Sequence, residues 1–137
     1  MMPAERRRRI AMSAEQLTAF LDGSAEMVVA YVDAAGWPVG TLARADRHRE
    51  EITVEFDDPT GTAAGVGVGD AVCCVAEQGA RYDEIRGAIV RGEVTAAATA
   101  DGRHRWTVRA RHTSSFDFAA LADPPGESSE PVSPRQP

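Results

Sequence analysis

The sequence predicts a small, mainly β domain, a six-stranded antiparallel barrel with one or two short helices. Three observations favour this fold class. The 137 residues are the length of a single domain. About six short apolar segments follow one another with mostly short turns between them, and only one segment has clear helical spacing. Closing such strands into a barrel leaves no exposed sheet edge, so a barrel is the simplest architecture.

The helix is expected directly after Ser13. Ser13 can cap a helix, and Gln16, three residues later, can complete a capping box. Apolar residues then follow at helical spacing as far as Leu21, and Gly23 is a typical helix stop.

The strands are expected at residues 27–32, 37–44, 51–56, 71–77, 84–97 and 105–111. Gly87 and Gly92 interrupt the fifth strand and should mark bends or bulges. Asp101-Gly102 predicts a hairpin turn into the last strand. In that strand Trp106 and Val108 share one face, and arginines and a threonine occupy the other. Residues 57–70 are glycine-rich and form the least regular part of the body.

The chain divides into three parts. Residues 1–11 form a basic arm with four consecutive arginines, which we expect to be a flexible, solvated segment. Residues 12–121 form the barrel domain. Residues 122–137 form a tail rich in proline and serine, which we expect to be disordered.

Composition excludes several functions. The 15 basic residues are all arginine, so there is no lysine for a Schiff base or for a phosphate-binding P-loop. The net charge of −6 argues against nucleic acid and against an anionic membrane surface as partners. No apolar run is long enough to span a membrane and no signal peptide is evident, so a cytoplasmic protein is expected.

No side chains form a recognisable catalytic or metal-binding constellation. The histidines lie in or beside turns without metal-ligand spacing, and surface positions are expected for all three: His48, His104 and His112. The pairs Glu50-Glu51, Asp57-Asp58 and Asp83-Glu84 are expected to be solvated turn residues. The adjacent Cys73 and Cys74 should point to opposite faces of a strand. We therefore assign no catalytic residue and no metal site. Either the protein is not an enzyme, or a bound cofactor supplies the reactivity.

Apolar residues on both faces of the fifth strand predict a homodimer. Ile85 and Ile89 lie on one face, and Ala88, Val90 and Val94 on the other. A small barrel has one interior, so the second apolar face needs a different cover, and a subunit interface is the simplest one.

Three segments together resemble the pyridoxamine 5′-phosphate oxidase-like family of flavin-binding split barrels. The first is Met12–Gly40, with the capped helix, the first strand and the turn Ala35-Gly36-Trp37-Pro38. The second is Ile52–Pro59, which resembles the third strand of the family and its exit loop. The third is Tyr82–Gly92, a tyrosine-led strand punctuated by two glycines, followed later by Ser115–Phe118.

This resemblance implies an FMN-binding split-barrel fold and a homodimer with FMN in clefts between the subunits. Some members of the family hold a deazaflavin coenzyme instead, and some bind heme or its breakdown products. Carried over by position, Arg44 would be the phosphate-binding cation of the second strand. Thr60 and Thr62 would be the hydroxyls of the loop after the third strand, and Phe56 would lie near the ring system.

The loop departs from the family pattern, and this leaves two functional hypotheses open. Many flavin-binding relatives have an Arg-Lys pair there, whereas this chain has no basic residue between Asp57 and Asp70. The first hypothesis is a flavin- or deazaflavin-dependent oxidoreductase that acts on a small molecule. The alternative is a barrel without flavin that binds or sequesters an apolar or heme-like ligand, or that serves as a structural dimeric partner.

Overall fold

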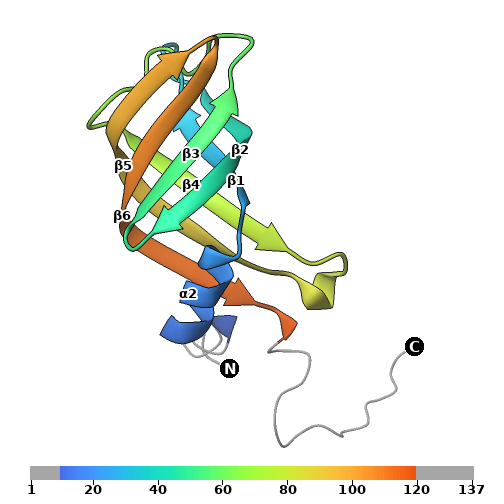
Figure 1. Cartoon of the computed structure of the whole chain (residues 1–137). Helices are drawn as coiled ribbons and strands as arrows, with labels where there is room; N and C mark the ends of the chain where they lie inside the picture. The colour runs from blue at the N-terminus through green and yellow to red at the C-terminus, as the bar shows by residue number, and fades with distance from the viewer. Residues whose placement is uncertain (1–9, 120–137) are drawn as a thin grey trace, which may run out of the picture.

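The protein is a closed antiparallel barrel. A computed structural model describes residues 10–119, and most of the basic arm and the whole proline-rich tail lie outside this range. The elements are α2 (Ala14–Asp22), β1 (Glu26–Val32), β2 (Pro38–His48), β3 (Glu51–Asp57), β4 (Ala71–Gln78), the 3-10 turn η1 (Tyr82–Glu84), β5 (Arg86–Ala100) and β6 (Arg103–Asp117). The strand order around the barrel is β1-β2-β3-β6-β5-β4 (Figure 1). The predicted fold class is confirmed.

Helix α2 begins at the predicted cap. The Ser13 Oγ accepts the Gln16 N–H at 3.1 Å, and the Ser13 N–H donates to the Gln16 Oε1 at 2.8 Å, which completes the capping box. Gly23 ends the helix by donating its N–H to the Ala19 carbonyl at 3.1 Å. Phe20 and Leu21 are buried, so the helix packs its apolar face on the barrel.

Two strands are longer than predicted. Strand β2 continues to His48, and β6 runs from Arg103 to Asp117. The prediction ended these strands among charged residues, but in a barrel the outward positions face water and accept arginine or aspartate while the alternate positions point inward. The hairpin at Asp101-Gly102 is confirmed, and both residues have positive φ, 54° and 76°. The register shift between Arg91 and Gly92 confirms a bulge at the second glycine of β5.

The two ends of the barrel are closed differently (Figure 1). Helix α2 lies at the end where β2 turns into β3, and Leu17 packs there against the core. Residues 58–70 lie at the other end, beside the β5–β6 hairpin, and contribute the fully buried Ala63. The core between them includes Trp106, which is fully buried. Within residues 10–119, no helix has the length and apolar character needed to cross a membrane.

Candidate functional site

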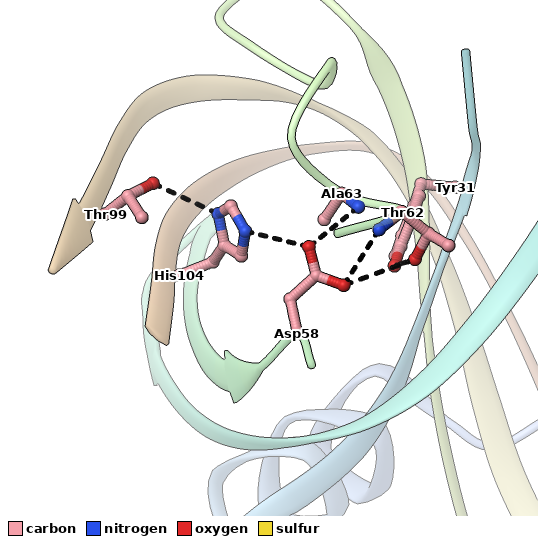
Figure 2. A network of polar contacts seen from close by, with 6 residues as sticks. All are labelled: Tyr31, Asp58, Thr62, Ala63, Thr99 and His104. Carbon is pink, nitrogen blue, oxygen red and sulfur yellow. Dashed lines mark hydrogen bonds and ion pairs between the residues drawn. The ribbon is translucent and has the colours of Figure 1, made fainter. Parts of the chain in front are cut away.

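A buried polar network closes the barrel at the end formed by residues 58–70 (Figure 2). Its centre is Asp58, whose side chain is only 5% exposed. One carboxylate oxygen accepts the Thr62 N–H at 3.0 Å and the Thr62 hydroxyl at 3.3 Å. The other oxygen accepts the Ala63 N–H at 2.9 Å and lies 3.1 Å from the His104 Nε2. One carboxylate thus holds the first turn of the loop against β6.

His104 joins this loop to the β5–β6 hairpin. An ionised carboxylate only accepts hydrogen bonds. The His104 Nε2 is therefore protonated, and its N–H donates a hydrogen bond to Asp58. The Nδ1 lies 3.2 Å from the Thr99 hydroxyl, which can donate to a neutral imidazole or accept from a charged one. Phe56 stacks on the imidazole with ring centroids 5.3 Å apart. All the polar atoms of the ring therefore have partners.

The hydroxyl of Thr62 is already engaged within the network. It donates to Asp58, and the Tyr31 hydroxyl lies 2.7 Å from its oxygen. Because Thr62 has a single O–H proton, Tyr31 is the donor in that second bond. Thr62 could therefore donate to a phosphate oxygen only by giving up its bond to Asp58.

Hydrogen bonding keeps Asp58 ionised inside the barrel. Burial by itself raises the pKa of this carboxyl group, because it disfavours the charged form. The Ala63 N–H, His104 and the Thr62 N–H act in the opposite direction, and together they leave the pKa below its ordinary value of 3.8. The carboxylate is therefore charged at neutral pH.

Two expectations from the sequence were wrong here. His104 was expected on the surface and is 7% exposed, and Asp58 was expected to be a solvated turn residue. The alternation of inward and outward side chains along β3 and β6 could have predicted that Asp58 and His104 point inward. Asp58 continues the inward series that Phe56 ends, and His104 precedes the inward Trp106 by two residues. The predicted last strand began at Arg105, one residue after His104, and Asp58 lies one residue beyond the end of β3 at Asp57, so neither residue was counted in a strand.

A groove on the outer face of β2, β3 and β6 contains the cation predicted to bind phosphate. It has a volume of about 350 Å³ and is lined by Ala25, Arg44, Ala45, Asp46, Thr53, Glu55 and Arg105. Arg105 is paired with Glu55 at 3.4 Å. Within the part of the chain that the structure describes, no carboxylate lies within ion-pair distance of Arg44. Arg44 is exposed and its guanidinium is available to a ligand.

The structure divides the four predicted site residues between two places. Arg44 lies on the outer face of β2, between the inward Ala43 and the half-buried Ala45. Phe56 is 3% exposed in the barrel interior, near the network that contains Thr62. Thr60 is exposed in the same loop. The structure therefore brings Phe56 and Thr62 to one end of the barrel interior, and it does not place Arg44 on the same side of the sheet.

A second outer face is apolar and crosses four strands. The strand registers place Leu42, Val28, Val75 and Ile89 side by side from β2 through β1 and β4 to β5. Leu42 is 63% exposed and Val28 is 38% exposed. Next to this row lies a shallow cavity of about 330 Å³, whose lining is mostly apolar. We call this surface, with Leu42, Val28, Val75 and Ile89 at its centre, the apolar face.

The described part of the chain contains no cluster of metal-binding side chains. Among residues 10–119, no group of three or more histidine, cysteine, aspartate or glutamate side chains could hold a metal ion. Cys73 and Cys74 are free thiols, half-buried and buried respectively, on opposite sides of β4. Burial raises the pKa of the Cys74 thiol to about 12, so it stays protonated and behaves as an apolar core residue.

Comparison with known proteins gives matches in structure alone. No protein-family model and no curated protein sequence matches the chain. Protein Rv2991 from Mycobacterium tuberculosis is 18% identical with a TM-score of 0.68, and the alignment covers 94% of this chain and 97% of that one. An FAD-binding protein from Mycobacterium smegmatis is 12% identical with a TM-score of 0.58, covering 80% and 98%. The heme storage protein HutZ from Vibrio cholerae is 11% identical with a TM-score of 0.60, covering 77% and 96%.

At these identities the matches establish the fold. The closed six-stranded barrel, the strand order and the single long helix of the described residues agree with the architecture inferred from the three sequence segments. The chain thus has the split-barrel fold of the pyridoxamine 5′-phosphate oxidase-like proteins.

Proposed function

We propose that the protein binds a flavin-type cofactor and acts as an oxidoreductase on a small molecule. The observation that carries this proposal is Arg44, an exposed guanidinium that lies in a groove of about 350 Å³ and has no carboxylate partner among residues 10–119. A guanidinium gives phosphate two parallel charge-assisted hydrogen bonds. Structural likeness to an FAD-binding protein supports the same class of ligand. The cofactor we propose is FMN, and a deazaflavin coenzyme is the alternative within this class. We also propose that the protein is located in the cytoplasm.

The residues of the groove fit the phosphate end of such a cofactor only in part. Arg44 would hold the phosphate, and the Thr53 hydroxyl lies in the same groove as a further donor. Asp46 and Glu55 also line it and would repel an anion, although Glu55 is partly neutralised by Arg103 and Arg105. A bound flavin ring would supply the redox chemistry, and the chain would bind and orient it.

The first test is replacement of Arg44 by alanine. We expect the affinity for FMN to fall roughly 10- to 150-fold without loss of the fold, because one charge-assisted interaction is worth about 1.5–3 kcal/mol. Quenching of flavin fluorescence measures it. Arg111→Ala is the matched control, since Arg111 is paired with Glu93 at 2.9 Å and does not line the groove. Equal affinities of wild type and Arg44→Ala would remove the phosphate assignment. Absence of quenching in the wild type would remove the flavin proposal.

We further propose that two copies pair through the apolar face. Strand β5 carries apolar residues on both faces: Ala88, Val90 and Val94 are buried in the barrel, while Ile89 is half-buried on the outside. A specific interface needs about 800 Å² on each partner. The apolar face spans four strands and continues along the outer side of β1 to Val32, which is 59% exposed, and this apolar character suits a self-complementary contact.

Replacing Leu42 by aspartate tests this contact. A carboxylate at the centre of an apolar interface would be desolvated without a partner in both copies, so we expect the dimer dissociation constant to rise at least about 100-fold. Sedimentation equilibrium measures it. Val68→Asp is the control, because Val68 is 69% exposed but lies in the loop outside the apolar face. A wild type that stays monomeric at micromolar concentration would contradict the dimer.

A heme-like ligand is the second candidate. It is favoured by the cavity of about 330 Å³ on the apolar face, where Pro38, Val32 and Cys73 meet Arg91. An apolar surface with one cation suits a flat apolar ring that carries carboxylates. The likeness to a heme storage protein supports this reading. A visible absorption spectrum of the purified protein, and titration with hemin beside FMN, will separate the two ligands.

A further inference from the structure

A separate cavity lies between helix α2 and the barrel, at the end away from the polar network. Its volume is about 140 Å³. Leu21, Ile52 and Val90 form apolar walls, and each of them is at most 4% exposed. Ala110 lines it from β6. An engineered apolar protein cavity of about 150 Å³ stays dry and binds benzene, so this space is suited to a single small ring or a short branched chain.

Two arginines are among the residues that line this cavity. Arg47 lines it from β2 and is held by Asp22 of α2, with 2.7 Å between the Nη1 and the Oδ1. That bond uses one of five N–H donors, so Arg47 keeps donors for a second acceptor. Arg49 follows in the β2–β3 turn, and no carboxylate among residues 10–119 lies within ion-pair distance of it. Glu50 is the single carboxylate in the lining.

Arg49 occupies a backbone conformation that disfavours it. Its φ is 61°, in the left-handed region where a side chain costs about 1–2 kcal/mol and where glycine is the usual residue of a tight hairpin turn. An exposed arginine at this place is therefore less stable than glycine would be, and it forms no ion pair with the part of the chain that the structure describes. Residues with positive φ occur in hairpin turns, as Asp101 does here, and they also cluster at ligand-binding sites.

We propose that the cavity binds a small apolar carboxylic acid, with the ring or branched chain against Leu21, Ile52 and Val90 and the carboxylate on Arg49. Arg47, fixed by Asp22, supplies a further donor in the lining. The cavity does not share a residue with the groove of Arg44, so this site is independent of the flavin proposal. Its volume limits the ligand to the size of benzoate.

Benzoate and its neutral isostere benzamide provide the first comparison. We expect benzoate to bind in the millimolar range, as suits so small a ligand, and benzamide to bind roughly 10-fold more weakly. Titration of the full chain, followed by NMR shifts of the methyl groups of Leu21, Ile52 and Val90, measures both. Equal binding of the two compounds would overturn the carboxylate assignment. Absence of saturable shifts for either compound would overturn the site.

The Arg49→Gly variant separates a ligand role from a structural one. We expect its melting temperature to rise by about 3 °C, because glycine adopts the positive φ without strain. We also expect its preference for benzoate over benzamide to disappear. Arg111→Gly, at a strand position on the outer surface, should keep that preference. An Arg49→Gly variant that still prefers benzoate would contradict the proposal.

Two substitutions that fill the space locate the ligand. Ala110→Leu places a larger side chain in the cavity, and Thr18→Phe covers it from the exposed side of α2 without altering the buried core. Each should abolish binding of both compounds in a chain that remains folded. Unaltered benzoate binding in a folded Thr18→Phe variant would show that the ligand lies elsewhere.

Discussion

Replacement of Asp58 by alanine should lower the free energy of unfolding by about 3–5 kcal/mol, because it leaves buried donors without an acceptor. The N–H groups of Thr62 and Ala63 and the Nε2 of His104 all donate to this carboxylate. Their loss would also release the loop from the barrel end. Urea denaturation measures the change, and amide hydrogen exchange at residues 58–70 shows whether the loop opens.

Asp57 offers a matched control in the adjacent position. Its side chain is 71% exposed and is paired with Arg103 on the outer surface at 3.3 Å. Such pairs contribute about 0–1 kcal/mol, so Asp57→Ala should be close to neutral. Equal destabilisation by the two alanine variants would show that the carboxylate of Asp58 does not anchor the loop.

The same carboxylate should make stability depend on pH in acid. The pKa of Asp58 in the folded protein lies below its ordinary value of 3.8, so near that pH the unfolded chain binds more protons than the native protein. This contribution to stability is complete above the ordinary value and is lost as the pH falls through the folded pKa. The Asp58→Asn variant should lack this part of the acid-induced loss, which urea titrations between about pH 5 and pH 2 would detect.

The sequence was sufficient for the fold because local signals and the two-residue periodicity agree. The capping box at Ser13 and Gln16 gave the helix start, and Asp101-Gly102 gave the last hairpin. Strand ends were less accurate because outward charged residues on β2, and threonine and serine near the end of β6, look like turns when read one at a time. A strand end inside a barrel depends on the length of the partner strand, which no single segment contains.

The candidate sites were only partly predictable. Arg44 was proposed as a phosphate-binding residue through the family resemblance alone; it lines a groove, and no carboxylate within residues 10–119 is within ion-pair distance of it. The pairing of Asp58 with His104 joins residues 46 positions apart, so no local pattern reveals it. The cavity beneath α2 depends on how Leu21 and Arg49 pack across separate elements. The spacing of residues in the sequence predicts the side of a strand or helix on which a residue lies. It does not predict which residue from a distant part of the chain contacts that residue.

Gly92 should be among the least replaceable residues of the barrel. A Cβ built at this position would lie 2.3 Å from the Arg109 carbonyl oxygen and 2.9 Å from a methyl carbon of Val108. The carbonyl belongs to the neighbouring strand β6, so it can move only if the pairing at the bulge is disturbed.

We therefore expect Gly92→Ala to lower the free energy of unfolding by about 2–3 kcal/mol, at the upper part of the range for overpacking. Gly40→Ala is the control within a strand, since its Cβ would meet a methyl carbon of Val28 at an ordinary 3.4 Å. Chemical denaturation of both variants gives the difference. A Gly92→Ala protein as stable as Gly40→Ala would mean that the β5–β6 pairing adjusts freely at the bulge. The close approach of β5 and β6 would then not exclude a side chain at position 92.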